Sequence, residues 1–323
     1  MKAIRYHEVG GPEVLRLDDV PEPTPGPGEV RIRVKAAGVN FADTERRRGL
    51  YDAKSPLPRI LGSEAAGVVD AVGSGVDAKW VGRRVVALAL QSYAELATTS
   101  EQELLELPEH VSFEEAAGLL VQGLTAWHLI HTSAQLRPGQ RVLIHAAAGG
   151  VGLLAIQLAK QAGATVLGTV STEEKARLAR EAGADDVFVY GGTSSVAEWV
   201  RELTAGSGVE VVLDSVGAST WESSLESLAP FGHLVAYGSA SGHPPPVDVE
   251  ALYAKSLKIS AYWLRTPHPP ALQRQAREAL GQGLAKGQLR VRVGLVVGLG
   301  EAARAHQQLE SRATVGKVVL RVP

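Results

Sequence analysis

One segment limits the fold of this chain more than any other: residues 141–152, which read RVLIHAAAGGVG. An apolar strand runs into Ala147-x-Gly149-x-x-Gly152, and an apolar helix follows at once. Gly149 lets the backbone approach a pyrophosphate, and Gly152 lets the helix pack close to the strand. The free N–H groups of the first helical turn then face the phosphates. The segment therefore predicts a dinucleotide-binding turn in which Ala147 replaces the first glycine.

Strand and helix patterns alternate from about residue 125 to residue 263. Repeated units of this kind predict an α/β fold with a parallel, doubly wound sheet of the Rossmann type. Ser171 and Glu174 have the spacing of a capping box for the second helix. The predicted strands are Arg141–Ala147, Thr165–Val170, Asp186–Tyr190, Val209–Asp214, His233–Tyr237 and Leu257–Trp263, and the predicted helices are Gly150–Ala162, Thr172–Ala182, Ser195–Thr204 and Thr220–Leu228.

The segments on either side of this series have a different pattern. Glu29–Lys35 alternates apolar and charged residues, as a half-buried strand does. After Thr266–Pro270 the β-α alternation stops, and we expect the tail to return to the N-terminal domain. The expected domains are therefore a discontinuous, β-rich domain over 1–123 and 264–323, and a Rossmann domain over 124–263. The tail is predicted to contain Ala271–Leu284 and Glu301–Leu309 as helices and Val291–Val297 and Lys317–Val322 as strands.

Composition excludes several classes of function. The 323 residues contain no cysteine, which rules out disulfides, thiolate nucleophiles and Cys-ligated zinc or iron–sulfur sites. A net charge of −2 argues against a globally basic nucleic-acid binder. No apolar run is long enough to span a membrane, and the N-terminus lacks a signal-peptide core, so we expect a cytoplasmic protein. Asn40 is the only asparagine in the chain, which makes its retention informative.

The end of the second predicted strand bears on the choice of cofactor. An NAD site usually places an acidic residue there for the ribose hydroxyls. This chain has Thr169-Val170-Ser171-Thr172 instead, with Lys175 one turn later. A neutral tip with a nearby cation favours the 2′-phosphate of NADP. The alternative is that Lys175 is only a solvated helix residue and that Glu173 or Glu174 serves the ribose.

The chain resembles the medium-chain dehydrogenase/reductase superfamily over essentially its whole length. In the segment 37–43, Asn40 stands where many members have a cysteine that ligates catalytic zinc. Ser63 stands where they have a ligating histidine, and Gln122 stands where they have the third ligand. The resemblance implies a GroES-like catalytic domain, and the three replacements predict that no metal is bound. His128 and His131 are one helical turn apart and are interpreted as surface histidines.

Within the superfamily, the best match is the zinc-free quinone oxidoreductase, or zeta-crystallin-like, group. The resemblance rests on residues 38–44, 48–51, 145–152, 214–217 and 309–314. It implies a homo-oligomer, a dimer or tetramer, that reduces quinones with NADPH. The cofactor-binding residues expected from the motifs and this resemblance are Thr125, Ala147, Gly149, Gly150, Val151, Gly152, Ser171, Lys175, Tyr190, Ser215, Gly217, Gly238, Ser239 and Arg312.

Reduction of a quinone without a metal requires hydrogen-bond donors for the charge that develops on the acceptor oxygen. Asn40, Gln122 and Tyr51 are the candidate donors, and Asp43 is expected to orient Asn40 or Tyr51 or to close a turn. Tyr51 has an alternative interpretation as a surface aromatic beside a loop. The run Arg46-Arg47-Arg48 is interpreted as a solvated face.

Two other functions stay open at this point. An NADPH-dependent enone or enoyl reductase would share the fold and the missing zinc. A binding or structural protein, including an RNA-binding one, would keep NADPH as a stabilising ligand only. Turnover of NADPH with several quinones distinguishes an enzyme from a binding protein.

Overall fold

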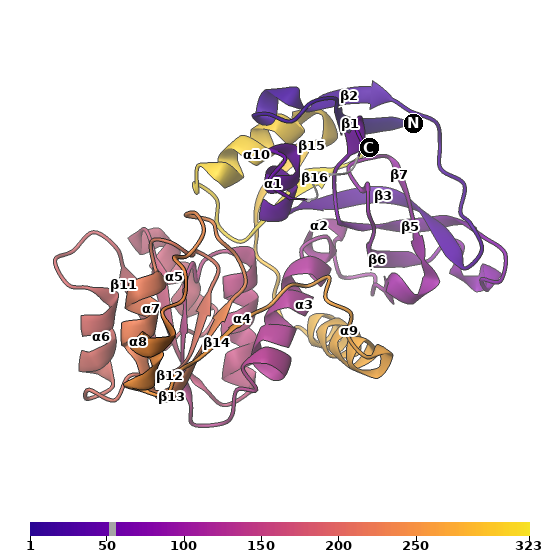
Figure 1. Ribbon diagram of the computed structural model, residues 1–323. Coiled ribbons are helices and arrows are strands. Elements are labelled where there is room, and N and C mark those ends of the chain that lie inside the picture. Colours follow the sequence, from indigo (N-terminus) through magenta and orange to yellow (C-terminus); the bar gives the residue numbers. More distant parts are fainter. Residues whose placement is uncertain (52–55) are drawn as a thin grey trace. The chain divides into compact units, whose positions relative to one another are not determined.

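The computed structural model describes residues 1–51 and 56–323, which divide into two compact units. Unit 1 comprises Met1–Gln122 and Gln273–Pro323, and unit 2 comprises Gly123–Leu272. Unit 1 is thus built from both ends of the chain, which Figure 1 colours indigo to magenta and orange to yellow. In the part of the chain that the structure describes, no helix is both long and apolar enough to cross a membrane.

Strands and helices alternate along unit 2, as the hydrophobic pattern predicts. The predicted strands Thr165–Val170 and Val209–Asp214 have the observed bounds, and the first predicted helix is one residue too long. The elements are α3 (Leu120–His128, which begins in unit 1), β9 (Arg141–Ile144), α4 (Gly150–Gln161), β10 (Thr165–Val170), α5 (Glu173–Glu181), β11 (Asp186–Val189), α6 (Val196–Leu203), β12 (Val209–Asp214), α7 (Trp221–Ser227), β13 (Leu228–Ala236), α8 (Val249–Tyr253) and β14 (Lys258–Ala261).

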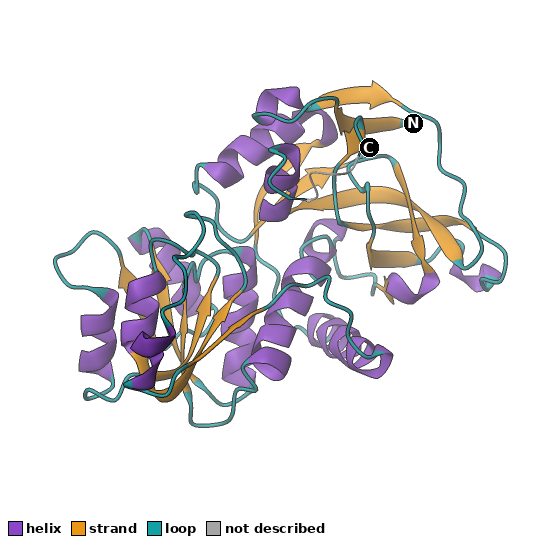
Figure 2. Cartoon of the chain, in the orientation of Figure 1, coloured by secondary structure: helices purple, strands orange, loops and turns teal. Residues whose placement is uncertain are grey.

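The strands of unit 2 form one parallel sheet in the order β11-β10-β9-β12-β13-β14. Helices lie on both faces of this sheet (Figure 2), so the predicted doubly wound α/β class is confirmed. The strand order reverses at β9, which has β10 on one side and β12 on the other. Ligands of open α/β sheets bind at the carboxyl ends of the strands beside such a reversal. The fold therefore directs attention to the loops that follow β9, β10 and β12.

Apolar side chains hold α6 and α7 against this sheet. Leu143 and Val212 pack in one cluster with Val200 of α6 and Trp221 of α7. Val200 and Val212 are fully buried, and burial of such a side chain contributes about 1.5–3 kcal/mol. The strand ends are thereby fixed, and so are the loops that leave them.

Unit 1 contains two sheets. The larger has the order β15-β16-β3-β5-β6-β8, with β7 also paired to β3, and the smaller has the order β2-β1-β4. The bounds are β1 (Lys2–Tyr6), β2 (Arg16–Asp19), β3 (Glu29–Val39), α1 (Phe41–Arg47), β4 (Arg59–Ile60), β5 (Glu64–Val72), β6 (Arg84–Leu88), β7 (Leu96–Ser100), β8 (Leu104–Glu106), α2 (Phe113–Ala116), α9 (Pro270–Ala285, which begins in unit 2), β15 (Val293–Gly298), α10 (Ala302–Glu310) and β16 (Lys317–Arg321).

Strand β3 connects the two ends of the chain. Its alternation is confirmed, because Val30, Ile32 and Val34 are fully buried. The strand continues beyond the predicted end at Lys35, since residues 36–39 pair with β16. The C-terminal strand therefore lies beside the start of α1, which places Lys317 next to residues of the first fifty positions.

Candidate active site

The turn after β9 has the geometry of a phosphate-binding turn. Ala146 has a φ of 51°, and Gly149 precedes the first turn of α4. A Cβ on Gly152 would lie 2.6 Å from the carbonyl oxygen of Ala146, so only glycine fits there. A Cβ on Gly168 would lie 2.9 Å from the Cβ of Ala147. The glycine in β10 therefore makes room for the alanine that replaces the first glycine of the motif.

The loop after β10 carries the predicted nucleotide-recognition residues. Lys175 Nζ donates a hydrogen bond to Ser171 Oγ at 3.2 Å, so the two groups lie together. The prediction that Ser171 caps the second helix is wrong, because Thr172 is the N-cap and its hydroxyl accepts from the Lys175 backbone N–H. A Thr at the cap leaves the Ser171 hydroxyl beside the ammonium. A hydroxyl and an ammonium at this place suit a phosphate.

The loop after β12 and the loop after β13 carry the predicted residues Ser215, Gly217, Gly238 and Ser239, and they pack together. Gly217 has a φ of 88°, and a Cβ there would lie 2.5 Å from the carbonyl oxygen of Gly242. A Cβ on Gly238 would lie 2.8 Å from the carbonyl oxygen of Ser215. The backbone N–H of Gly242 donates to the carbonyl of Ser239 at 2.9 Å. The two glycines therefore let the loops after β12 and β13 pack backbone against backbone at the carboxyl edge of the sheet.

These three loops fit a dinucleotide. They supply a helix N-terminus, small residues where a side chain would block the backbone, and a cation at the second strand tip. Gly150 and Val151 lie in the first turn of α4, and the nearly buried Thr125 lies on α3. Tyr190 follows β11 directly, with its hydroxyl donating to Thr169 Oγ1. Arg312, in contrast, belongs to unit 1 and has a φ of 57°.

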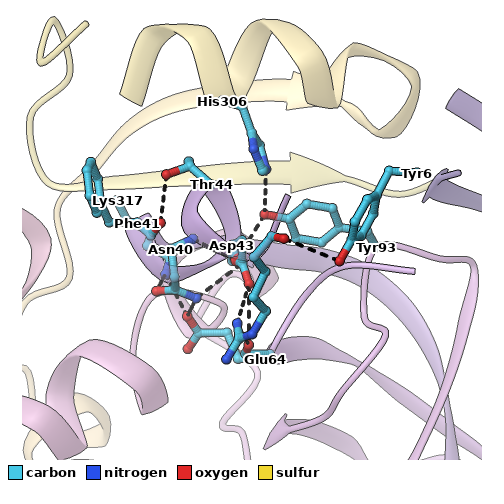
Figure 3. Close-up of polar contacts among 12 residues, drawn as sticks. Tyr6, Asn40, Phe41, Asp43, Thr44, Glu64, Tyr93, His306 and Lys317 are labelled. Atoms are coloured by element: carbon cyan, nitrogen blue, oxygen red, sulfur yellow. Dashed lines mark hydrogen bonds and ion pairs between the residues drawn. The ribbon is translucent and has the colours of Figure 1, made fainter. Parts of the chain in front are cut away.

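A second group of predicted residues lies in unit 1. Asn40 directly precedes α1, and its backbone N–H donates to Asp43 Oδ2 at 3.0 Å. Asp43 thus orients Asn40 through the main chain and not through the amide side chain. The Asn40 amide is turned toward two other residues, Glu64 of β5 and Lys317 of β16 (Figure 3).

Lys317 and Glu64 form a fully buried ion pair beside Asn40. Lys317 Nζ donates to Glu64 Oε1 at 2.6 Å and to Asn40 Oδ1 at 2.7 Å, and Asn40 Nδ2 donates to Glu64 Oε1 at 3.0 Å. The other Glu64 oxygen accepts the backbone N–H of Val121 at 2.9 Å. A Cβ on Gly38 would lie 2.6 Å from Glu64 Oε1 and 2.7 Å from Lys317 Cε, so the glycine makes room for the pair.

A second chain of polar groups continues from Asp43. His306 Nε2 lies 3.3 Å from the Tyr93 hydroxyl, and that hydroxyl donates to Asp43 Oδ2 at 3.1 Å (Figure 3). On the other side of the ring, Arg47 Nη1 lies 3.4 Å from His306 Nδ1. Burial, followed by the positive charge of Arg47, lowers the pKa of His306 to about 3. Burial raises the pKa of the Asp43 carboxyl, and the guanidinium of Arg46 opposes that shift.

Arg46 connects Tyr51 to the same group. Its Nη1 donates to Asp43 Oδ1 at 2.9 Å and to Ser63 Oγ at 3.0 Å. Its guanidinium carbon lies 4.7 Å above the centre of the half-buried Tyr51 ring. The prediction that the arginine run is a solvated face is therefore wrong for Arg46 and Arg47, which are buried.

We call Asn40, Asp43, Arg46, Arg47, Ser63, Glu64, Tyr93, His306 and Lys317 the polar cluster.

Gln122, the fourth predicted catalytic residue, follows Val121 on α3. Its Oε1 is buried and has no hydrogen-bond partner in the part of the chain that the structure describes. A buried acceptor without a partner costs about 1–3 kcal/mol, which a donor group on a ligand would offset.

The residues at the three ligand positions do not fit a zinc ion. Zinc prefers thiolate, imidazole and carboxylate donors. Asn40 and Gln122 supply neutral amides and Ser63 supplies a hydroxyl, while the Lys317 ammonium lies 2.7 Å from the Asn40 oxygen and would repel a dication. Among residues 1–51 and 56–323, no group of three or more His, Asp or Glu side chains could hold a metal ion.

His128, interpreted above as a surface residue, is in fact buried.

Sequence reasoning missed most of the polar cluster. Glu64 was visible as one acidic residue at the start of the apolar strand EAAGVV, and Lys317 as one cation at the start of KVVLRV. A charged residue directly before an apolar run in a strand is a signal for a buried ion pair. Tyr93 and His306 carry no such signal, because nothing in the sequence pairs positions 213 residues apart.

Known proteins resemble the chain across both units. Its residues 26–136 match the family model of the alcohol dehydrogenase GroES-like domain, and residues 150–280 match that of zinc-binding dehydrogenases. A quinone oxidoreductase of Pseudomonas aeruginosa is 45% identical over 99% of this chain and 99% of that protein. A 2-haloacrylate reductase of a Burkholderia species is 40% identical over 97% of each. The structure of Escherichia coli quinone oxidoreductase complexed with NADPH has a TM-score of 0.92 and 39% identity, covering 99% of this chain and 100% of that one.

Proposed function

This chain belongs to the quinone oxidoreductase family of the medium-chain dehydrogenases/reductases, and from that premise we propose how its residues serve reduction of a quinone with NADPH. The observation that carries the proposal is the donor set around Asn40, in which a buried ammonium donates to the amide oxygen of Asn40 and to Glu64. Such a site polarises an acceptor oxygen by hydrogen bonds alone.

The loops of unit 2 would hold the cofactor. The N–H groups of Gly150 and Val151 face the pyrophosphate, and Ser171 with Lys175 binds the 2′-phosphate. Ser215, Gly217, Gly238 and Ser239 lie in two loops that pack together, and we place the nicotinamide end of the cofactor beside them. When bound, NADPH supplies the hydride, and the protein contributes position and electrostatics.

Asn40 is proposed as the donor to the quinone oxygen. One Nδ2 hydrogen goes to Glu64, and the other has only a long contact, 3.4 Å, with the carbonyl of Gly38. Because Lys317 donates to the amide oxygen, the amide is polarised and its remaining N–H becomes a stronger donor. A quinone needs no stronger acid, since the oxygen that gains charge can take its proton from solvent.

Tyr51, Gln122 and Asp43 have supporting roles in this proposal. The Tyr51 phenol, held under the Arg46 guanidinium, offers a second donor. The unpartnered Gln122 Oε1 accepts the O–H of the hydroquinone product. Asp43 is a positioning residue that fixes the Asn40 backbone and the Arg46 side chain.

The second candidate function is reduction of an activated alkene. The observation that favours it is the 40% identity to a 2-haloacrylate reductase. Reduction of such a substrate places a hydride on one carbon and requires a proton at the neighbouring carbon. Among the three proposed donors, Asn40, Gln122 and Tyr51, the Tyr51 phenol is the one that could act as that acid.

We also propose a homo-oligomer in the cytoplasm. Strand β14 lies at the edge of the sheet of unit 2 with β13 on its inner side, and Trp263 just beyond it is half exposed. An edge strand beside exposed apolar surface is a usual place for a second subunit. The lack of cysteine suits a reducing compartment, where disulfides do not form.

The test compares kcat/KM for a simple para-quinone and for 2-chloroacrylate, each with NADPH. We expect the quinone to be the better substrate, and Asn40→Ala to lower kcat/KM for the quinone while NADPH affinity stays unchanged. Thr44→Ser is the matched control, because the Thr44 hydroxyl on α1 serves only the carbonyl of Phe41. If 2-chloroacrylate is better by an order of magnitude, the alkene reductase replaces the quinone reductase.

A further inference from the structure

His145 lies at the centre of the carboxyl edge of the unit 2 sheet, and the proposed chemistry gives it no role. It follows β9 directly and is fully buried. Its Nδ1 lies 3.0 Å from Thr169 Oγ1 in β10, and its Nε2 lies 3.0 Å from Ser224 Oγ on α7. The imidazole ring of His145 therefore connects β10, on one side of β9, to α7, which packs on the other side.

The Ser224 side of this contact ends on a buried carboxylate. Ser224 Oγ donates to Asp214 Oδ2 at 2.9 Å, and Thr220 Oγ1 donates to the same oxygen at 2.8 Å. The other oxygen accepts the backbone N–H groups of Val216 at 2.7 Å and Gly217 at 3.1 Å. Asp214 thus fixes the loop that is expected to face the nicotinamide end of the cofactor.

The Thr169 side ends on Tyr190. The Tyr190 hydroxyl donates to Thr169 Oγ1 at 3.0 Å and lies 3.3 Å from His145 Nδ1. The backbone N–H of Tyr190 donates to the carbonyl of Val170 at 3.0 Å, which is the residue before Ser171. Tyr190 therefore lies against the end of β10, where the 2′-phosphate is expected to be recognised.

Counting hydrogens fixes the direction of every link. A hydroxyl has one hydrogen, and Ser224 uses it on Asp214, so Ser224 must accept from His145 Nε2–H. A neutral imidazole with hydrogen on Nε2 has Nδ1 as an acceptor, and the Thr169 hydroxyl donates to it. Thr169 Oγ1 then accepts from Tyr190. Five side chains thus form a one-way chain of hydrogen bonds from Tyr190 to Asp214.

We propose that His145 is a positioning residue which, held as the Nε2–H tautomer, couples the nucleotide tip after β10 to the loop after β12 through this chain. The inference rests on the proposed function, because it assumes that a dinucleotide occupies the carboxyl edge of the sheet. Burial lowers the pKa of His145, and the negative charge of Asp214 opposes this shift. Because the net direction is downward, the ring is neutral near pH 7.

The direction of these hydrogen bonds also assigns a role to Tyr190, which the family resemblance gives only as a cofactor-binding residue. In the ligand-free protein its hydroxyl hydrogen goes to Thr169, and we assign its role to this contact and not to the 2′-phosphate. Recognition of that phosphate at this tip then falls to Ser171 and Lys175. Tyr190→Phe should therefore weaken NADPH and NADH by the same factor, whereas a direct contact would make the loss selective for NADPH.

The first experiment reads the tautomer in the ligand-free protein. Nitrogen-15 NMR of histidine-labelled protein, with the His145 signals assigned from His145→Gln, should show hydrogen on Nε2 at pH 7. Addition of NADPH should shift these signals although His145 touches no ligand. Hydrogen on Nδ1, or an imidazolium, would overturn the proposal.

The second experiment measures NADPH and NADH dissociation constants by calorimetry. Thr169→Val and Ser224→Ala each remove one hydroxyl from the series of hydrogen bonds. Each should raise the dissociation constants of NADPH and NADH about three- to tenfold, the range for one lost hydrogen bond. Thr169→Ser keeps the hydroxyl and should restore affinity. Ser223→Ala is the matched control on α7, because that hydroxyl serves only the carbonyl of Thr220.

The outcomes separate this proposal from the proposed function. Wild-type protein that binds NADPH, with variants that bind it equally well, refutes the positioning role alone. Loss in Tyr190→Phe that is confined to NADPH also refutes it, because it shows a direct phosphate contact. Wild-type protein that binds no dinucleotide refutes the proposed function and this role with it.

Discussion

The buried ion pair of Lys317 and Glu64 allows a sharp test of what holds unit 1 together. The perturbation is Lys317→Met, which keeps an unbranched stem of similar length and removes the charge. Both side chains are fully buried, so water cannot solvate the Glu64 carboxylate that remains. That carboxylate keeps only the N–H of Val121 and the amide of Asn40 as partners.

Two effects contribute to the loss of stability, and their magnitudes differ. A volume-conserving exchange in a core costs less than about 1.5 kcal/mol. Removal of one partner from a buried ion pair costs about 3–5 kcal/mol, because an uncompensated charge stays behind. The charge effect dominates, and it is a large fraction of the total stability of about 5–15 kcal/mol for a folded protein. We therefore expect a loss of about 3–5 kcal/mol in the free energy of unfolding of unit 1.

The double variant Lys317→Met/Glu64→Gln distinguishes the two effects. A glutamine leaves no buried charge, and replacement of a whole buried pair is often nearly neutral. The double variant should therefore recover most of the stability lost in the single variant. Lys79→Met is the control, because its pair with Asp77 is exposed to solvent and should matter little.

The measurement must report on unit 1, since a two-unit protein need not unfold in one step. Native-state hydrogen exchange of the β3 and β16 amides gives that local free energy. A loss below about 1 kcal/mol in the single variant would refute the reasoning, and so would a double variant that is no more stable than the single one.

Three further predictions concern pH, cofactor choice and metal. Burial lowers the pKa of His306 from 6.5 to about 3, so the unfolded chain binds more protons than the folded chain below pH 6.5. The free energy of unfolding therefore falls as the pH falls, by about 2 kcal/mol at pH 5. His306→Gln should flatten this pH dependence in acid unfolding curves. If the free energy of unfolding of His306→Gln depends on pH as that of the wild type does, the assignment of this dependence to His306 is wrong. Lys175→Glu should weaken NADPH at least about tenfold more than NADH in calorimetry, because only the 2′-phosphate loses a cation, and an equal loss for both would contradict the assigned contact. Purified protein should contain no stoichiometric zinc by elemental analysis, and a chelator should leave quinone turnover unchanged; one zinc per chain with chelator-sensitive turnover would overturn the metal-free donor set.

The cofactor unit was largely predictable from the sequence because its signals are local. The strand, the small residues and the helix of the dinucleotide turn are contiguous, and steric limits at Gly149 and Gly152 act within one turn of chain. Parallel strands alternating with helices then leave few possible topologies. The error at the second helix was also local: Ser171 and Thr172 are both good N-caps, and the sequence pattern does not choose between them.

The polar cluster shows what the sequence left undecided. Asn40 and Asp43 are close along the chain, and both were identified. Lys317 lies 277 positions from Asn40 and 253 from Glu64, and only the pairing of β16 with β3 brings them together. Arg47 looks like a solvated charge until α1 and α10 enclose it beside His306.

The sequence by itself determined the elements and the turn that binds a dinucleotide, because hydrophobic periodicity and steric limits are properties of neighbouring residues. Tertiary structure alone decided which charges are buried, which hydroxyls point inward and which tautomer His145 must adopt. Those features depend on hydrogen bonds between residues far apart in the chain, such as His145 and Ser224, 79 positions apart. A buried polar group is stable only when such a partner is in place, and only the folded chain provides one.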